Sequence, residues 1–207
     1  ESNNVTLNVM PVNDAPTIDN LPDNFAIDED TSFELQVEAS DIDGDDLIYS
    51  VNNILATINS SGFLTFTPEL NFNGIVNLTV NVSDGQDYSL GTAQVTVNSV
   101  NDAPVIDTIN DIVFDEEGYN DSVDLDLYVD DVETADEDIA WSYSNGANLI
   151  INIDETTHIL NISADEDWYG TRNITLTATD DEGVSSDVNV AVIVNNINDA
   201  PYFTTTP

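Results

Sequence analysis

One five-residue phrase occurs three times along this chain and limits its possible folds more than any other feature. It reads Val-Asn-Asp-Ala-Pro at residues 12–16 and 100–104, and Ile-Asn-Asp-Ala-Pro at residues 197–201. Its copies stand 88 and 97 positions apart, a spacing that is typical of tandem domains. Each copy ends in proline, which holds the preceding residue in an extended conformation and stops a strand. The phrase is therefore interpreted as a short, stiff linker between β domains.

The linkers give the predicted domain boundaries. Residues 13–100 and 101–198 are predicted to be two complete repeats. Residues 1–12 are predicted to be the last strand of a preceding repeat, and residues 199–207 the start of a following one. Because the chain begins within an alternating apolar run, without Met, we expect it to be part of a longer protein.

Between the linkers, apolar residues alternate with polar ones, which is the period of strands buried on one face. Clear examples are the runs at residues 33–39 and 76–82. A strand equivalent to the first of these is predicted through Val123, Leu125, Leu127 and Val129. Short strands at this spacing, with glycines at the turns, predict an all-β fold of tandem seven-stranded Greek-key β-sandwiches of the immunoglobulin-like type.

Negative charge dominates the composition. The chain has 41 Asp and Glu residues against a single basic residue, Arg172, and its formal net charge is −40. This charge excludes nucleic acid and anionic membrane surfaces as partners, because both are recognised by Lys and Arg. Such acidic chains are often disordered, but 41% hydrophobic residues in alternating runs indicate a folded protein. No apolar run is long enough to cross a membrane, so direct membrane insertion is not expected.

The acidic residues gather at equivalent places in the two repeats, between predicted strands. Residues 28–30 correspond to 115–117, and residues 69–71 correspond to 165–167. Several clustered carboxylates do not all protonate at neutral pH, so salt or a bound metal must offset their repulsion. Oxygen ligands from Asp, Glu and Asn, without Cys or His, favour Ca²⁺ over zinc or copper. The alternative is a solvated acidic surface, as in a halophile.

With these motifs, the whole chain resembles the tandem cadherin-like repeats of prokaryotic surface proteins and adhesins. The resemblance rests on the three linkers, on Asp41-Ile42-Asp43-Gly44 before Leu47-Ile48-Tyr49-Ser50, and on the acidic turn at Asp84. It implies Ca²⁺ bound between successive domains. The implied ligands between the two repeats are Glu29, Glu69, Asn71, Asn101, Asp102, Asp131, Glu133 and Asp180. An N-terminal half-site would use Asn13, Asp14, Asp41, Asp43 and Asp84, and a C-terminal half-site Glu116, Asp165, Asp167, Asn198 and Asp199.

Two departures from the cadherin pattern bear on the number of ions. Asn98 and Asn195 replace the aspartate that the family has upstream of the linker. Thr67-Pro68-Glu69 replaces the Leu-Asp-Arg-Glu phrase of animal cadherins. We therefore expect one or two ions per junction instead of three, and no strand-swap adhesion.

The resemblance implies an extracellular structural and adhesive repeat of a large cell-surface protein or filament, stiffened by calcium into a rod. Its expected partners are neighbouring repeats of the same chain and other copies in a surface assembly. One alternative is a surface-layer or fibre domain of a halophile without specific calcium sites. Another is a carbohydrate-binding module with Trp141, Trp168 and Tyr169 as its sugar platform. Tyr49 and Phe72 stand at the places that match the two tryptophans, which favours core packing for both.

No enzymatic activity is expected. The sequence has neither a nucleophile elbow nor a Gly-rich phosphate loop, and its single histidine, His158, is predicted to be a surface or edge residue of a strand. Asn-x-Ser/Thr triplets, which accept glycans in secreted proteins, begin at Asn4, Asn59, Asn77, Asn81, Asn120, Asn161 and Asn173.

Overall fold

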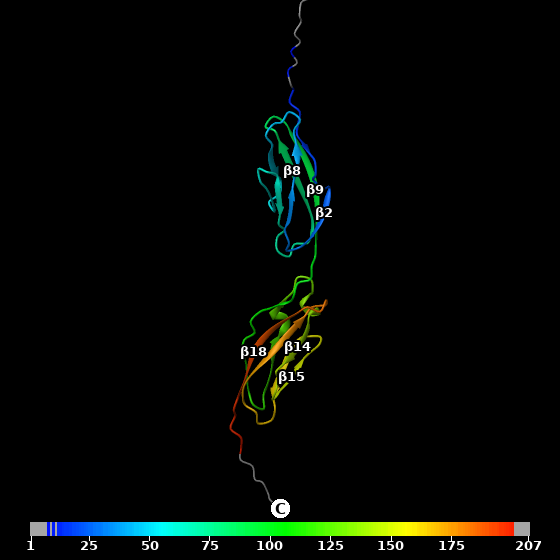
Figure 1. Cartoon of the computed structure of the whole chain (residues 1–207). Coiled ribbons are helices and arrows are strands. Elements are labelled where there is room, and N and C mark those ends of the chain that lie inside the picture. The colour runs from blue at the N-terminus through cyan, green and yellow to red at the C-terminus, as the bar shows by residue number, and fades with distance from the viewer. Residues whose placement is uncertain (1–7, 9, 11, 201–207) are drawn as a thin grey trace, which may run out of the picture. The chain divides into compact units, whose positions relative to one another are not determined.

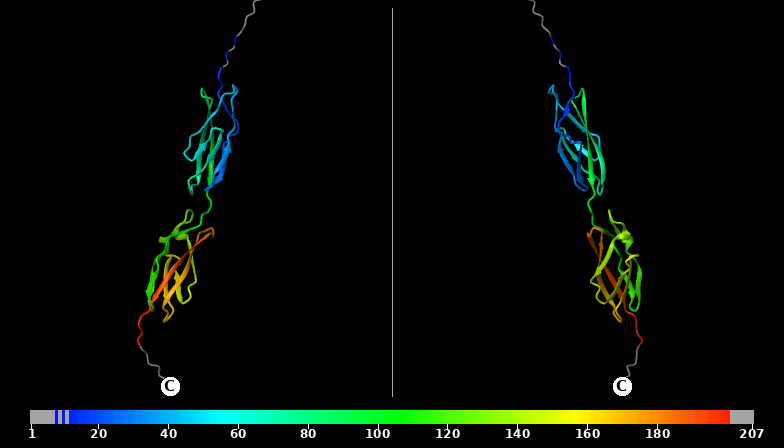
Figure 2. Two further views of the ribbon diagram at one scale, coloured as in Figure 1. Left: turned by 60° about the vertical axis from the view of Figure 1, so that its left-hand side comes forward. Right: turned by 90° about the vertical axis from the view of Figure 1, so that its right-hand side faces the viewer.

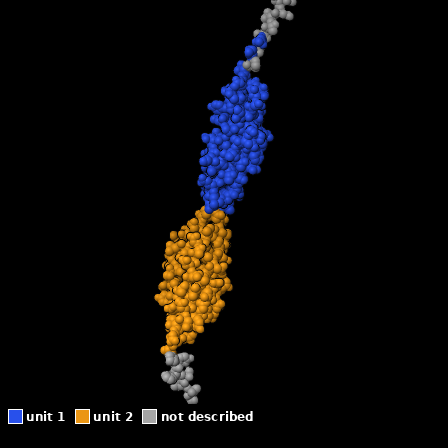
Figure 3. All heavy atoms as spheres, turned by 90° about the vertical axis from the view of Figure 1, so that its left-hand side faces the viewer, with its two compact units in different colours: residues 1–100 blue, residues 101–207 orange. Residues whose placement is uncertain are grey.

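The computed structural model describes residues 8, 10 and 12–200. The chain forms two compact units, residues 1–100 and 101–207, which are called unit 1 and unit 2 below (Figure 3). The strand predicted within residues 1–12 falls largely outside the described residues. Asn4 and residues 201–207 also lie outside them.

The described part of unit 1 is a sandwich of a four-stranded and a three-stranded sheet (Figure 1). The larger sheet has the strand order β2-β9-β8-β5 and the smaller has β3-β7-β6, while β1 and β4 form a separate two-stranded ribbon. The strands are β1 Thr17–Ile18, β2 Asn24–Asp28, β3 Phe33–Gln36, β4 Ala39–Ser40, β5 Ile48–Val51, β6 Ala56–Ile58, β7 Phe63–Phe66, β8 Gly74–Ser83 and β9 Tyr88–Asn98.

The described part of unit 2 repeats this topology strand for strand. Its sheets have the orders β11-β18-β17-β14 and β12-β16-β15, and β10 pairs with β13. The strands are β10 Val105–Ile106, β11 Ile112–Asp115, β12 Tyr119–Asp124, β13 Val129–Asp130, β14 Ala140–Ser144, β15 Leu149–Ile153, β16 Ile159–Ala164, β17 Gly170–Thr179 and β18 Ser185–Asn195. The predicted all-β, immunoglobulin-like fold class is confirmed.

One long antiparallel hairpin carries the core of each unit, β8 with β9 and β17 with β18. Alternate side chains of β8 are fully buried, namely Leu78, Val80 and Val82, as the period-2 pattern predicts. The outer strand β2 runs parallel to β9, with Asp28 opposite Asn98, and β11 runs parallel to β18 with Asp115 opposite Asn195. This register brings the acidic turn after β2 to the point where the chain leaves unit 1. The acidic turn after β11 has the same place in unit 2.

The strand predicted through residues 123–129 is wrong in its middle. β12 ends at Asp124, and a 3₁₀ helix, η1, spans Leu125–Tyr128 before β13 begins. Asp124 Oδ1 caps this helix by accepting a hydrogen bond from the backbone N–H of Asp126 (3.3 Å). A strand would turn Leu125 and Leu127 to the same face, whereas the helix buries Leu125 and exposes Leu127.

A second short helix, η2 at Asp136–Asp138, precedes β14. The sequence reading also missed β15, because its run Leu-Ile-Ile-Asn-Ile has no clean alternation. In each unit the chain enters at one end of the sandwich and leaves at the opposite end (Figures 1 and 2). In the part of the chain that the structure describes, no helix is long and apolar enough to cross a membrane.

Candidate metal centres at the ends of the units

A tight loop at the N-terminal end of unit 1 is organised by one carboxylate. Asp41 Oδ1 accepts hydrogen bonds from the backbone N–H groups of Asp43 (2.8 Å), Gly44 (3.0 Å) and Asp45 (3.3 Å). Gly44 has a φ of +79°, which glycine adopts without steric cost. Carboxylate oxygens of Asp41, Asp43 and Asp45 lie within 4.8 Å of one another. Asp45, which the sequence reading did not include, therefore joins the two predicted ligands.

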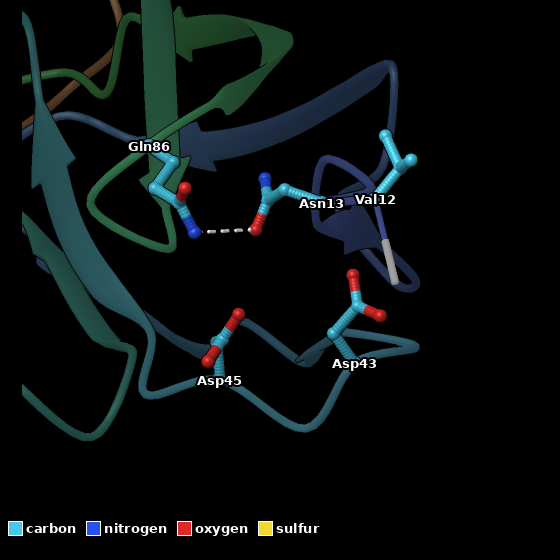
Figure 4. Close-up of a pocket in the computed structure, with 5 residues that line it drawn as sticks. All are labelled: Val12, Asn13, Asp43, Asp45 and Gln86. Carbon is cyan, nitrogen blue, oxygen red and sulfur yellow. Dashed lines mark hydrogen bonds between the residues drawn. The ribbon is translucent and has the colours of Figure 1, made fainter. Parts of the chain in front are cut away.

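The first linker copy, residues 12–16, is hydrogen-bonded to this loop and to the turn at Asp84. Asn13 Nδ2 donates to Asp84 Oδ2 (3.0 Å), and the backbone N–H of Asp14 donates to Asp43 Oδ2 (2.8 Å). Gln86 Nε2 donates to Asn13 Oδ1 (2.8 Å) across a pocket of about 310 Å³ that Asp43 and Asp45 also line (Figure 4). All five residues predicted for the N-terminal half-site thus lie together at this end.

Unit 2 repeats the arrangement with equivalent residues. Asn101 Nδ2 donates to Asp180 Oδ2 (2.8 Å), and the backbone N–H of Asp102 donates to Glu133 Oε2 (3.1 Å). Asp131 Oδ1 accepts from the N–H groups of Glu133 (3.1 Å) and Thr134 (2.7 Å), as Asp41 does in its own loop. The five unit 2 residues of the predicted inter-repeat site are therefore together at its N-terminal end.

Several oxygens of these predicted ligands are buried without a partner. Among the described residues, seven buried side-chain polar atoms make no hydrogen bond, and five of them belong to predicted ligands. These five are Glu29 Oε2, Asp41 Oδ2, Asn101 Oδ1, Asp102 Oδ2 and Asp131 Oδ2. A buried acceptor that lacks a donor costs free energy, and a carboxylate oxygen costs more than a neutral one. Buried oxygens in this state fit cations bound at the ends of the units.

The carboxyl groups that bind the linker asparagines are held in their ionised form. The Asn13 amide, followed by the N–H groups of Asp87 and Gln86, lowers the pKa of Asp84 below its ordinary value. Burial raises the pKa of Asp180, but hydrogen bonds from the Asn101 amide and the N–H of Val184 outweigh it, so this pKa is also lowered. Both groups therefore stay negatively charged at neutral and mildly acidic pH.

A buried glutamate marks the C-terminal end of each unit. Glu29 is only 3% exposed, and its Oε1 accepts from the backbone N–H of Val100 (2.7 Å). Glu116 is 2% exposed, and its Oε1 accepts from the backbone N–H of Ile197 (2.6 Å) and from Asn196 Nδ2 (2.8 Å). These two carboxylates hold the chain where it leaves the sandwich.

The remaining predicted ligands at the C-terminal ends are more exposed. In unit 1, Glu69 is exposed, while the backbone N–H of Asn71 donates to Asp30 Oδ1 (3.0 Å). In unit 2, oxygens of Glu117, Asp167 and Asp199 lie within 4.8 Å of one another.

Glu117 was not among the predicted ligands of the C-terminal half-site. Its backbone is left-handed, with a φ of +66°, as is that of Asp30 (+59°) at the equivalent place in unit 1. Asp165 is exposed beside this cluster, and Asn198 Nδ2 donates to the carbonyl of Asp199 (3.2 Å), as Asn101 does to Asp102 (3.0 Å). Whether ligands of unit 1 and unit 2 share one ion stays a prediction.

The tryptophans, predicted to be core residues, pack against the core of unit 2. Trp141 stands opposite Ala178 on β17, as Tyr49 stands opposite Val82 on β8, and Phe72 packs in unit 1 where Trp168 packs in unit 2. The prediction of a surface or edge histidine is wrong. His158 is 6% exposed and lies in the turn before β16.

Glycan acceptors among the described residues differ in accessibility. Asn59, Asn77, Asn161 and Asn173 are exposed, whereas Asn81 and Asn120 are partly buried. Asn81 Oδ1 is one of the buried oxygens without a partner. Asn59 Oδ1 and Asn120 Oδ1 each accept hydrogen bonds from the serine two residues on, so these side chains are engaged in local turns.

Residues 13–98 match the family model described as bacterial Ig domain, and they make up almost all of the described part of unit 1. This part of the chain is similar to bacterial Ig domains. Unit 2 shares its strand order, so both units have the same immunoglobulin-like fold. A comparison with curated protein sequences finds no significant match.

Solved structures show that the chain has the fold of cadherin domains. EC1-2 of human protocadherin-24 has a TM-score of 0.55 and 18% sequence identity, with 88% of this chain and 99% of that chain covered. Domains 3-6 of protocadherin gamma B2 give 0.53 and 17%, covering 89% and 48% of the two chains. Mouse cadherin-23 EC22-24 gives 0.51 and 16%, covering 88% and 65%. The cadherin-like, immunoglobulin-like resemblance inferred from the linkers is thus confirmed.

Proposed function

We propose that the carboxylate clusters at the ends of the two units bind Ca²⁺, and that the chain is a calcium-stiffened structural and adhesive repeat of a large cell-surface protein. The five buried, unpartnered ligand oxygens carry this proposal, because cations bound at the ends of the units would supply the partners that these oxygens lack. Without a cation, the same oxygens oppose folding through desolvation and mutual repulsion.

The chemistry of the ligands selects calcium among common cations. The clusters offer carboxylate and amide oxygens without sulfur or imidazole. Ca²⁺ accepts six to eight such oxygens in flexible arrangements, whereas Mg²⁺ requires near-ideal geometry and gives up its water reluctantly. The resemblance to cadherins points to the same ion.

Both sides of the linker are hydrogen-bonded to a unit, so an ion bound to the same residues would also restrain the linker. The backbone N–H of Val100 is bound to Glu29 of unit 1, and the side chain of the next residue, Asn101, is bound to Asp180 of unit 2. Ions that fix Glu29 and Asp102 would therefore restrain consecutive stretches of chain. Repeated units joined in this way form a quasi-linear array in which each unit contacts its sequence neighbours.

Location and partners follow from the same proposal. Bacterial Ig and cadherin-like domains are typically extracellular, where millimolar calcium saturates weak sites. The partners are neighbouring repeats of the same chain and other copies of the protein in a filament or surface layer. The role is one of structure and adhesion instead of catalysis.

Unfolding of the fragment in millimolar Ca²⁺, in chelator, and in chelator with molar NaCl tests the proposal. Calcium should raise the melting temperature by more than salt does, and Asp102→Ala should abolish the difference in unit 2. If NaCl alone restores the melting temperature fully, the carboxylates form a solvated halophilic surface and the calcium sites are rejected.

A further inference from the structure

The larger sheet of unit 1, which includes the labelled strands β2, β8 and β9, has one face toward the core and the other toward solvent (Figure 1). Because successive residues of a strand point to opposite faces, the buried Leu78, Val80 and Val82 mark the residues between them on β8 as outward-facing. None of the outward residues of β5, β8 and β9 is charged: Ile48, Ser50, Ile75, Asn77, Thr79, Asn81, Ser83, Tyr88, Leu90, Thr92, Gln94, Thr96 and Asn98. The edge strand β2 adds one carboxylate, Asp28. In a chain with 41 acidic residues among 207, the outward side of β5, β8 and β9 is an exception, and it is called the uncharged face below.

Large apolar side chains are exposed on the uncharged face. Ile48, Ile75, Tyr88 and Leu90 have exposed fractions between 59% and 63%. Three of them lie toward one end, because Ser83 of β8 stands opposite both Ile48 and Tyr88. Leu90 follows Tyr88 by two residues, so both side chains point to the same side of β9. Leu90 also lines a hollow of about 460 Å³ that is formed with residues of β1.

Unit 2 shows that the fold does not require these apolar side chains. Its hairpin of β17 and β18 has the same strand lengths and register as that of β8 and β9, so each outward residue has a counterpart. Ile48, Ile75, Tyr88 and Leu90 correspond in this order to Ala140, Thr171, Ser185 and Asp187. The same sandwich thus forms with small or polar residues at these places. A clustered apolar surface that folding does not require marks an interaction site.

We propose that two copies of the chain associate through the uncharged face, with unit 1 of one copy against unit 1 of the other. This inference rests on the proposed assembly of copies and deepens it by naming the contact. Two chains that each carry a net charge of −40 repel each other wherever acidic surfaces meet, so a face without charge brings them together at the lowest electrostatic cost. A basic partner would be attracted to the carboxylate clusters at the ends of the units instead.

The symmetry and the size of the face fit this partner. A contact between identical patches needs no second complementary surface, and two-fold contacts of this kind are the commonest in homo-oligomers. The uncharged face offers about a dozen residues, whereas a standard interface uses about 20–30 residues on each side. The contact is therefore weak for a single pair of units. Copies that are held side by side in a surface assembly meet at a high effective concentration, at which a weak contact is sufficient.

Sedimentation equilibrium of the whole fragment tests this inference between 10 µM and 1 mM protein, with 10 mM Ca²⁺ and with chelator, in 0.15 M and in 1 M NaCl. The fragment should form a reversible dimer in both the calcium and the chelator samples. Its dissociation constant should fall at least threefold in the higher salt, because salt screens the repulsion between the copies and does not weaken apolar contacts. A fragment that stays monomeric at 1 mM under all conditions, or a dimer that weakens in high salt, overturns the proposal.

Two variants compare the uncharged face with the opposite side of unit 1. Leu90→Asp installs the residue that unit 2 has at this place and should weaken association at least tenfold. Thr57→Asp adds the same charge at an exposed residue of β6, in the smaller sheet, and should leave the dissociation constant unchanged within twofold. Tyr88→Ser, which also installs the residue of unit 2, should weaken association if Leu90→Asp does not fold. Parent-like dimers of a folded Leu90→Asp or Tyr88→Ser variant, judged by circular dichroism, refute the role of the face.

Melting temperatures of the same samples separate this inference from the calcium sites. Dimers in a fragment that calcium does not stabilise would reject the calcium sites and leave the contact in place. Stabilisation by calcium in a fragment that stays monomeric would reject the contact and leave the calcium sites in place. Dimers that form only with Ca²⁺, and form equally in Leu90→Asp, would be bridged by ions between carboxylates and would also reject the uncharged face.

Discussion

Asp131→Asn separates the two roles that a single carboxylate has at the N-terminal end of unit 2. Asp131 Oδ1 shapes the loop by accepting from the N–H groups of Glu133 and Thr134, while Oδ2 is buried without a partner. Asparagine keeps an oxygen at the first position and removes the charge and the second oxygen. The loop should therefore survive, and a calcium ligand should be lost.

The expected magnitudes differ in sign between the two conditions. In chelator, losing one charge from the cluster should raise stability by up to about 1 kcal/mol, the Coulomb energy of one close pair at high dielectric. With a Kd of about 0.1 mM, typical of extracellular sites, 10 mM Ca²⁺ stabilises the parent by about 2.7 kcal/mol. A tenfold weaker site in the variant gives about 1.4 kcal/mol. The calcium response should thus fall by roughly half, or about 5–10 °C in the melting temperature of a domain of this size.

Tryptophan fluorescence isolates this effect, because Trp141 and Trp168 both belong to unit 2. Urea unfolding is measured with chelator and with 10 mM Ca²⁺. Asp154→Asn is the matched control: Asp154 Oδ1 accepts from the N–H groups of Thr156 (3.0 Å) and Thr157 (2.8 Å) in the same way, away from the clusters. The control should lose the same stability in both conditions. If Asp131→Asn behaves like the control, Asp131 is a structural acceptor and the reasoning about its free oxygen is wrong.

Three further predictions concern the fold. Hydrogen bonds from the N–H groups of Thr157 and Thr156 lower the pKa of Asp154 below 3.8. The contribution of Asp154 to stability is therefore present above that pH and is lost as the pH falls below it. Asp154→Asn should reduce this loss of stability at acidic pH, as measured by fluorescence-monitored unfolding. Gly62→Ala should destabilise unit 1 by at least about 1 kcal/mol by circular dichroism, because the new Cβ would lie 2.5 Å from the Val37 carbonyl at a φ of +82°; an unchanged transition would contradict it. Leu176→Ala, at a fully buried site, should cost unit 2 about 2–5 kcal/mol, and a smaller loss would mean that the core refills the space.

Much of the geometry of the carboxylate clusters was predictable because equivalent residues recur at the linkers. Asn13 binds Asp84 and Asn101 binds Asp180 through the same amide, as the repeated phrase and the repeated acidic turns together suggest. Asp45 and Glu117 were missed for different reasons. Asp45 continues the alternation of Asp41 and Asp43 around Gly44 and was within reach of sequence reasoning. Glu117 has a left-handed backbone, and no residue type around it predicts that conformation.

Burial was the property that sequence reasoning estimated worst. Glu29 and Glu116 are almost fully buried, while Glu69 and Asp165, which carry the same charge, are exposed. The difference arises from contacts about 70 to 80 residues apart: Glu29 reaches Val100, and Glu116 reaches Ile197. His158 is another case: its place between Thr157 and Ile159 in a predicted strand suggested the surface or an edge, whereas its partner Asp126 lies 32 residues earlier.

The sequence by itself determined the repeats, the alternation of the strands and the oxygen chemistry of the ends, because each of these is written in local patterns of residue type. Tertiary structure alone decided which carboxylates are buried. It also decided that Leu125–Tyr128 forms the helix η1 instead of a strand, and that Trp141 and His158 line one pocket. Those outcomes depend on how distant strands register and how much space the core leaves, and neither quantity is local to the residues concerned.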